Sequence, residues 1–577
     1  MRSNSDFDVL IRNGTVVDGT GRGRFRADIG IKGSRIEAIG RLESNDTQEI
    51  IDATGLIVSP GFIDVHTHAD TMLIHYPEAP NYIYQGVTTV IGGNCGYSAA
   101  PLNKYWLFDE WEYDWWHEIK PYRWHKPVMH SLKHVNKIME EKYGWIIDWK
   151  TLGEFFKKLE EKGISVNYAT FVGHNTLRTA VMGTDYKREA KKSEIGDMKK
   201  LVIEAMEDGA IGLSSGLLYE PGIYSSTNEL IELVKIVKEY NGIYVTHIRE
   251  TSPHERDKAL REAIKIGKCT KIPVHISHIF PVYFYPTVRP DALTESAQKI
   301  LKIIREAKES GISVTFDLIP NVSGGLFIIP YLSSLITPWI IKFGSLKKLG
   351  NALLRRETRR KIKLSIIKGK EPYFNPKQNP QWAKTIKILE TEIKDYEGRT
   401  LEEISKGDPI ETFLDIIQQD PKARFEFIYE NESEIKILIK HELGMIGSDT
   451  FPMDNRWCIN YPPFFLPHMN NYGAFSRFIR RYVREYSLLT IEEAVKKITY
   501  FPAKRFNLEG RGIIQRGAYA DIVIFDYRRI ADRGTYLEPR RYADGIKWVL
   551  VNGKIVLRNA QHTHLKPGKI LRRKTAG

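Results

Sequence analysis

The sequence predicts an α/β protein: a (β/α)8 TIM-type barrel with a small β-sandwich domain formed from both termini. Three observations predict this fold: short strands at both ends of the chain, eight apolar strand-like runs in its middle, and amphipathic helices after several of those runs. The chain has 577 residues, 42% of them hydrophobic and 27% charged. That composition suits a globular protein with one large domain and a smaller one.

Both ends of the chain consist of short strand-like runs separated by turns. The first sixty residues include a hairpin-like turn at Asn13-Gly14, a favoured turn dipeptide. The same pattern of short strand-like runs and turns is present in "GRGIIQRGAYADIVIFD" and "GIKWVLVNGKIVL" near the other end. We therefore expect residues 1–59 and 508–577 to form one β-rich domain, with a catalytic domain over 60–507 inserted between them.

The middle of the chain alternates apolar, β-branched runs with helical patterns. Residues 225–240 open with Ser226 and Glu229 in capping-box spacing, and residues 296–311 repeat the one-face apolar pattern and end at Gly311. Two inserts interrupt the alternation, at about 103–150 and 325–440. Eight continuous apolar runs predict parallel strands buried on both faces, at 61–66, 86–93, 164–174, 209–217, 242–248, 272–278, 312–318 and 443–449.

The first insert is dense in aromatic residues, in "YWLFDEWEYDWWHEIKPYRWH" at 105–125. One interpretation is a loop whose rings pack against the barrel or a second subunit. The other is a lid or apolar substrate wall at the barrel mouth, because barrel sites lie on the side from which such inserts emerge. The sequence leaves both open.

The net charge of +14 and its uneven distribution raise the question of a nucleic-acid partner. Much of the excess lies in residues 345–370, where basic and apolar residues alternate as in a solvated amphipathic helix. We find no nucleic-acid-binding motif and do not expect such a partner.

No membrane span and no secretory signal are visible, and three widely spaced cysteines make no disulfide framework, so we expect a cytoplasmic protein. A homo-oligomer is compatible with the sequence.

The candidate chemistry lies where the predicted strands end. His66 and His68 are two residues apart, so both imidazoles lie on one face of the strand. Cys95, in "GGNCGYS", follows the next strand, and later strands end at His247, His278 and Asp449. Six such side chains converging from five strands predict a metal site, and imidazole and thiolate ligands suit zinc. We interpret Cys95 as a thiolate ligand that could bridge two metals.

Four further residues are natural candidates that we place outside the ligand set. His275 lies three positions before His278, on the opposite side of the strand, and is expected to be structural. His174 ends the third strand and is expected only to border the site. Cys269 and Cys458 have no neighbouring ligand residues in the sequence and are also expected to be structural.

The motifs "GFIDVHTHAD" and "GNCGYS" resemble the amidohydrolase superfamily, and within it the D-aminoacylase (N-acyl-D-amino-acid deacylase) branch. The resemblance runs nearly end to end and includes "GLSSGLLYEPG", "YVTHIRE" and "YEGRTLEEI". It implies one tightly bound Zn2+ on Cys95, His247 and His278, and a weaker second site at His66 and His68. It also implies that metal-activated water attacks the amide carbonyl, with Asp449 as general base and then general acid.

The resemblance weakens at the residues that would bind the substrate. Members of that branch hold the substrate's carboxylate with a tyrosine, a lysine and an arginine; here the matching positions are Tyr219, Phe280 and Asn470. Losing a charge-assisted hydrogen bond costs roughly 1.5–3 kcal/mol. We therefore expect free N-acyl-D-amino acids to be poor substrates, and a neutral, cyclic or more apolar small-molecule amide to be a better one.

Three alternatives accompany this interpretation, and one is that the basic segment at 345–370 brings the enzyme to an anionic surface. The same scaffold could open a cyclic amide, as hydantoinases and dihydropyrimidinases do, although those typically use a carboxylated lysine rather than a cysteine. A non-catalytic basic binding protein on an amidohydrolase scaffold is the alternative from another class, and measured absence of metal would favour it.

Overall fold

The computed structural model describes residues 6–43, 47–107, 129–218, 220–250, 255–279, 292–322, 335–368, 381–427, 432–456 and 467–573. The predicted α/β class is confirmed: parallel strands alternate with helices through the middle of the chain.

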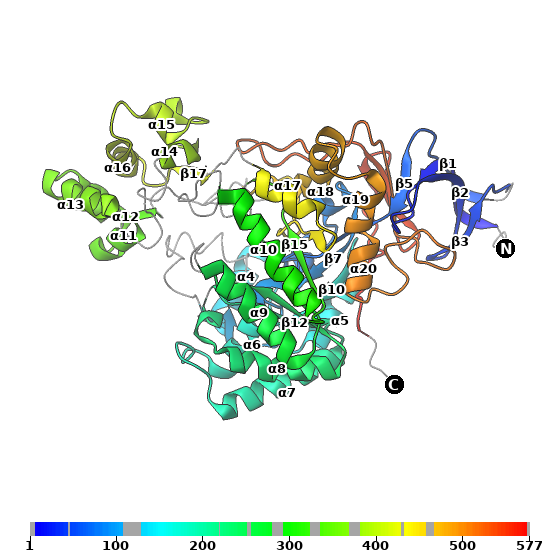
Figure 1. The fold of residues 1–577 in the computed structure, drawn as a ribbon, viewed down its shortest axis with the longest axis horizontal. Helices are drawn as coiled ribbons and strands as arrows, with labels where there is room; N and C mark the ends of the chain where they lie inside the picture. Colours follow the sequence, from blue (N-terminus) through cyan, green and yellow to red (C-terminus); the bar gives the residue numbers. More distant parts are fainter. Residues whose placement is uncertain are drawn as a thin grey trace.

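Strands from both ends of the chain share one nine-stranded sheet (Figure 1). The junction is an antiparallel pair in which Ile522 lies opposite Pro60. Apolar side chains from both ends, such as Ile29 and Ile522, pack in one core. The second layer of a sandwich and the domain boundaries stay predictions. The strands of this sheet are β1 (Phe7–Val16), β2 (Phe25–Lys32), β3 (Arg35–Gly40), β4 (Thr47–Asp52), β5 (Ile57–Pro60), β19 (Ile522–Phe525), β20 (Ile546–Val551), β21 (Lys554–Arg558) and β22 (Gln561–His562).

Two parallel sheets hold the strands predicted in the middle of the chain. The three-stranded sheet has the order β10-β7-β6, and the six-stranded sheet follows chain order. Only Phe171 separates β10 from β11, and a parallel bridge joins Thr67, just after β6, to Thr450, just after β18. These strands are β6 (Phe62–Asp64), β7 (Val87–Gly92), β10 (Asn167–Thr170), β11 (Val172–Gly173), β12 (Gly212–Gly216), β13 (Ile243–His247), β14 (Val274–Ile276), β15 (Val314–Leu318) and β18 (Gly444–Ile446).

Each of the eight predicted runs contains one of these strands, or the pair β10 and β11. All residues of β7, β12 and β15 are buried, as expected of parallel strands covered on both faces. Because neighbouring parallel strands end at one edge, their carboxyl ends bring distant parts of the sequence together.

Helices surround the parallel strands (Figure 1). The two predicted helices are present as α8 (Thr227–Glu239) and α10 (Ala292–Glu309), and Gly311 has a left-handed φ of 77° just beyond α10. The others in this part are α1 (Met72–His75), α2 (Pro80–Ile83), α5 (Leu152–Lys162), α6 (His174–Met182), α7 (Lys192–Asp208), α9 (Arg256–Thr270), α17 (Ser433–Lys440), α18 (Asn470–Arg477), α19 (Ile491–Ile498) and α20 (Tyr500–Arg505).

The insert regions have structure of their own. In the first, β8 (Tyr105–Leu107) pairs with β9 (Met129–Ser131), which precedes α4 (Leu132–Tyr143). The second has a separate apolar core and an antiparallel strand pair. Its elements are α11 (Thr337–Phe343), α12 (Leu346–Leu353), α13 (Arg356–Ile367), α14 (Trp382–Thr385), α15 (Leu401–Ile404), α16 (Pro409–Gln419), β16 (Ile386–Glu390) and β17 (Arg424–Phe427). Among the described residues, no helix has the length and apolar character needed to cross a membrane.

Candidate metal centre

The predicted ligand residues lie at the carboxyl ends of the parallel strands. His66 and His68 follow β6, Cys95 follows β7, and His247 is the last residue of β13. His278 lies two residues beyond β14 and Asp449 three beyond β18. All are buried except His247, which is half-buried. Five separate strands therefore deliver these six side chains to one place.

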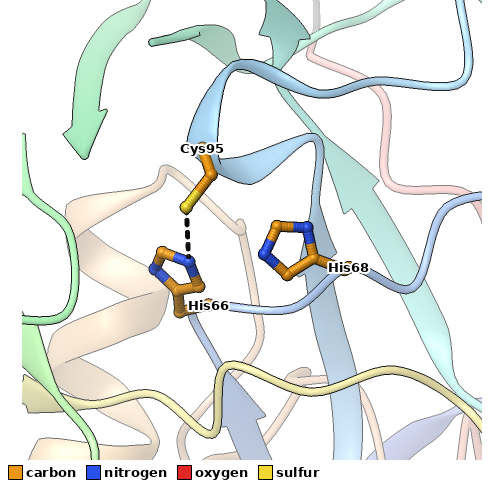
Figure 2. A group of neighbouring side chains, drawn as sticks. All are labelled: His66, His68 and Cys95. Carbon is orange, nitrogen blue, oxygen red and sulfur yellow. Dashed lines mark hydrogen bonds between the residues drawn. The ribbon is translucent and has the colours of Figure 1, made fainter. Parts of the chain in front are cut away.

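Cys95 lies at the centre of the group. Its sulfur is 3.3 Å from Nε2 of His66, as Figure 2 shows, and 3.2 Å from Nε2 of His278. Nδ1 of His247 is 3.8 Å from the same sulfur. Potential ligand atoms of Cys95, His247 and His278 all lie within 4.8 Å of one another, and so do those of His66, His68 and Cys95. Two triads of potential ligands therefore lie together, and they share the thiol of Cys95; their roles stay a prediction.

Asp449 lies beside His66 and His68. Its Oδ1 is 3.2 Å from Nε2 of His68 and 3.6 Å from Nε2 of His66. Burial opposes ionisation of this carboxyl, but the hydrogen bond from His68 and the nearby histidines hold the pKa of Asp449 below its ordinary value. The carboxylate is therefore ionised at neutral pH and able to accept a proton.

The chain also favours the thiolate form of Cys95. Burial raises the pKa of a thiol, but His278, His66 and His247 lower the pKa of Cys95 well below its ordinary value. Burial and the neighbouring His278 lower the pKa of His247 to about 4. Thiolate and neutral imidazole are the protonation states that bind metals.

His66 and His68 differ from His247 in this respect. Burial lowers their pKa values, but Asp317, Asp449 and the thiolate raise them well above the ordinary value. These two rings must therefore lose a proton before they can bind a metal.

Three residues of the group have a backbone conformation that is uncommon without glycine. The φ angles are 54° at Cys95, 26° at His278 and 54° at Asp449. Such residues cost about 1–3 kcal/mol each and are concentrated at functional sites. The backbone of Gly96, next to Cys95, lies very close to the backbone of Gly216. A Cβ on Gly96, whose φ is 81°, would lie 2.7 Å from the backbone nitrogen of Gly216. The "GNCG" turn thus points the thiol at the histidines.

Asp317, which the sequence did not single out, binds three histidines, two of which are candidate ligands. Its Oδ2 lies 3.4 Å from Nδ1 of His66 and 2.8 Å from Nε2 of His275. Its Oδ1 accepts the backbone N–H of His278 at 2.9 Å. Asp317 lies in β15, so the signal was a carboxylate inside an otherwise apolar strand. His275 also binds the hydroxyl of Thr315, at 2.8 Å, and its structural role stays a prediction.

Two further buried carboxylates brace the loops that carry the ligands. Asp64 accepts hydrogen bonds from the backbone of His66 at 3.2 Å and of Ser448 at 3.0 Å, and burial raises its pKa to about 7. Asp70 accepts the backbone N–H of Gly93 at 3.0 Å and the hydroxyl of Tyr168 at 2.8 Å. These bonds tie β6 to β18 and β7.

A pocket opens beside His68. Its apolar side includes Trp106 and Leu107 of β8, so the start of the aromatic insert borders the candidate site. Residues 108–125 of that insert lie outside the described residues, and the choice between lid and packing loop stays open. The lining residues are His68, Asp70, Tyr97, Ser98, Leu102, Trp106, Leu107 and Thr176.

Of the predicted substrate-binding residues, Tyr219 and Phe280 lie outside the described residues, as does Cys458. Asn470 begins α18 and is buried. Its Oδ1 accepts a hydrogen bond from Asn321 at 3.1 Å, whereas its Nδ2 is buried without a hydrogen-bond partner among the described residues. A donor is thus available at this position, and it is neutral.

His174 and Cys269 do not join the metal-binding group among the described residues. Nε2 of His174 lies 2.8 Å from Glu229, which also binds Arg178. Cys269 is an exposed free thiol in α9.

The comparisons with known proteins agree with this geometry. The amidohydrolase family profile matches residues 49–278 and 463–557. The D-aminoacylase of Alcaligenes xylosoxydans xylosoxydans is 32% identical over 570 residues, which are 99% of this chain and 98% of that protein.

The chain belongs to the amidohydrolase family.

Two solved structures extend the likeness. An N-acyl-D-glutamate deacylase from Bordetella bronchiseptica, in complex with zinc and a phosphonate inhibitor, is 28% identical with a TM-score of 0.70 and covers 98% of this chain and 99% of its own. A D-aminoacylase described as having a binuclear metal centre is 30% identical, with a TM-score of 0.71. The match covers 98% of this chain and 100% of that D-aminoacylase. This amidohydrolase is a metal-dependent enzyme acting on carbon–nitrogen bonds other than peptide bonds, and the predicted resemblance to D-aminoacylases is confirmed.

Proposed function

We propose that this amidohydrolase is a zinc-dependent deacylase of N-acyl amides, related to the D-aminoacylases. We also propose that the parallel strands form a (β/α)8 barrel; the parallel bridge between Thr67, after β6, and Thr450, after β18, supports its closure. The observation that carries the proposal is the assembly of Cys95, four histidines and Asp449 in one group, with the thiol of Cys95 at its centre.

The donor set fits zinc in chemistry, and the distances from its sulfur fit a tetrahedral site. A sulfur and a nitrogen on one tetrahedral zinc, at bond lengths of about 2.3 and 2.05 Å, lie about 3.5 Å apart. The distances from the sulfur of Cys95 to His278 and His247, 3.2 and 3.8 Å, bracket that value. Nδ1 of His247 and Nε2 of His278 lie 2.8 Å apart, closer than the roughly 3.3 Å between two nitrogens on one zinc. We assign Cys95, His247 and His278 to the tight site and His66 and His68 to a weaker one. Such a set leaves a position open for water or substrate.

When bound, zinc lowers the pKa of water from about 15.7 toward roughly 7 and polarises the amide carbonyl. Asp449 takes the proton of the attacking water, which its ionised state allows. His68, at 3.2 Å, holds the carboxylate in place for that step. Asp449 then delivers the proton to the nitrogen of the departing amine, because an amide anion is a poor leaving group.

The substrate is an N-acyl compound without a free carboxylate, so its binding needs no cationic side chain. Asn470 offers a neutral donor at the position predicted to bind the substrate, and the pocket beside His68 has apolar walls at Leu102, Trp106 and Leu107. Both features support a neutral or apolar substrate over a charged one.

The test compares acetate release by the zinc-loaded enzyme from N-acetyl-D-methionine and from its neutral α-amide. We expect the neutral amide to have the higher kcat/KM, by about tenfold or more, because no cation compensates the carboxylate at Asn470. The Asp449→Asn variant is the control and should lose about 10²–10⁴-fold in kcat while keeping its zinc.

Three outcomes contradict parts of the proposal. A clear preference for the free acid overturns the substrate assignment. Full activity of Asp449→Asn removes the role of Asp449. No acetate from either compound, with stoichiometric zinc bound, excludes the N-acyl assignment and directs the search to cyclic amides.

A further inference from the structure

The second insert presents a surface that the metal centre does not use. Its helices α11, α12, α13 and α16 pack around their own apolar core, which includes Leu349, Leu353, Ile362 and Phe413. Figure 1 shows these helices to one side, apart from the helices that surround the parallel strands. What this part binds can therefore be considered separately from the reaction.

The inner face of α13 is electrically neutralised. Arg359 is 3.1 Å from Glu411 and 2.6 Å from Asp415, both on α16. Lys363 is 2.9 Å from Glu411 and also pairs with Asp408 at the start of α16. These cations hold α13 against its neighbour, and their charge is balanced within the insert.

The outer face of the same helix carries cations that are not balanced. Arg355, Arg356, Arg360 and Lys368 are exposed, and the described residues include no ion-pair partner for any of them. Lys361 pairs only with Glu357, one turn earlier on the same exposed face. This face, over residues 354–368, is therefore strongly positive toward solvent.

Aliphatic side chains lie among these cations. Leu354 is 68% exposed, Leu364 41% and Ile367 38%. Leu364 is four residues after Arg360 and Ile367 seven after it, so they share one side of the helix. The described residues include seven exposed large hydrophobic side chains, and three of them fall within this short stretch. Such a concentration indicates a contact surface rather than scattered exposure.

We propose that the outer face of α13, residues 354–368, docks reversibly on an anionic lipid surface. Unbalanced arginines and lysines are attracted to anionic headgroups, and exposed leucine and isoleucine side chains can enter the boundary between headgroups and acyl chains. A nucleic acid would use the cations but leave the aliphatic side chains without a role. The stretch "LRRETRRKIKLSIIK" also has no aromatic residue on which a base could stack. The combination fits a lipid surface better. This proposal does not depend on the deacylase assignment.

The test is co-sedimentation of the full-length, zinc-loaded enzyme with vesicles of phosphatidylcholine alone or mixed with phosphatidylglycerol, at low and high salt. We expect binding to the mixed vesicles that falls with salt, and little binding to phosphatidylcholine. The triple variant Arg355→Gln, Arg356→Gln, Arg360→Gln should reduce the partition coefficient by about tenfold or more. A charge-matched control, Lys192→Gln, Lys258→Gln, Lys302→Gln, removes exposed cations from α7, α9 and α10 and should bind as the unaltered enzyme does.

A second variant, Leu364→Ser with Ile367→Ser, separates lipid insertion from attraction of any polyanion. It keeps every charge, and we expect it to weaken vesicle binding at both salt concentrations. Equal binding of this variant, together with arginine-dependent binding of a short DNA duplex, would overturn the lipid assignment in favour of a polyanion. Equal losses in the triple variant and its charge-matched control would show a net-charge effect and would also overturn it. Unchanged metal content and an unchanged circular dichroism spectrum show that each variant is folded.

Discussion

At the scale of single residues, the candidate centre depends on Asp317 as much as on its ligands. One carboxylate group faces the ring of His66, and also fixes the backbone of His278. Burial raises the pKa of a carboxyl, but His66 and His275 lower the pKa of Asp317 below its ordinary value, so it is charged. A negative charge behind a histidine makes that histidine a better metal ligand.

The Asp317→Asn variant should therefore bind zinc about 10–100-fold more weakly. A competition assay with a chromogenic chelator measures that affinity directly. The control is Glu229→Gln, a matched change at a buried carboxylate that binds His174 and Arg178, and it should keep the wild-type zinc affinity. Equal zinc affinity of Asp317→Asn and the unaltered enzyme would exclude this supporting role.

The sequence identified His66, His68, Cys95, His247, His278 and Asp449 because strand ends are recognisable from apolar runs that stop at polar residues. It missed Asp317, since that residue lies inside a strand and its importance comes from pairing with residues far away in the chain. It also missed the positive φ of Cys95 and Asp449, because only glycine adopts that conformation freely, and the enrichment of Asp there is too weak to place it at one position. Neighbouring chain segments impose it.

At the scale of elements, Glu229 joins α6 to α8. The sequence predicted a capping box at Ser226 and Glu229, and half of it is present: the Ser226 hydroxyl accepts the Glu229 N–H at 3.2 Å. The carboxylate instead binds His174 at 2.8 Å and Arg178 of α6. The sequence of α8 alone cannot predict that the carboxylate binds α6 instead of its own N-cap, because the two partners belong to another helix.

The Glu229 contacts predict a defined pH dependence of stability. Burial opposes its ionisation, but His174 and Arg178 lower its pKa from 4.5 to about 2. The stabilisation is thus complete above pH 4.5 and is lost as pH falls from 4.5 toward 2, and it amounts to about 3 kcal/mol. Urea unfolding of wild type and Glu229→Gln should differ most at neutral pH, and the difference should shrink between pH 4.5 and 3. A difference that is independent of pH would contradict this assignment.

At the scale of the whole molecule, a buried polar network joins the terminal sheet to the parallel strands. Asp521, just before β19, pairs with Arg511 and accepts a hydrogen bond from Asn167 of β10 at 3.1 Å. The side-chain amide of Asn552 donates a hydrogen bond to Oδ1 of Asn167 at 2.8 Å. The backbone N–H of Asn552 donates a second one to Oδ1 of Asp521, also at 2.8 Å. The C-terminal strands of the terminal sheet are thus fixed to β10, one of the parallel strands.

Replacing Asp521 by asparagine should destabilise the protein by about 3–5 kcal/mol, because it leaves the buried Arg511 guanidinium unpaired. Calorimetry should show a lower Tm. The matched control is Asp544→Asn, which breaks an ion pair with Arg533 in which both side chains are more than half exposed, and it should cost about 0–1 kcal/mol. Equal losses in the two variants would mean that the network does not join the two parts.

The central claim is that Cys95 holds the catalytic metal as a thiolate. X-ray absorption at the zinc K-edge tests it most directly, with the zinc-loaded enzyme and its Cys95→Ser variant. We predict one sulfur scatterer at about 2.3 Å from zinc in the unaltered enzyme, and only nitrogen and oxygen neighbours in the variant. A first shell of nitrogen and oxygen alone in the unaltered enzyme would contradict the claim.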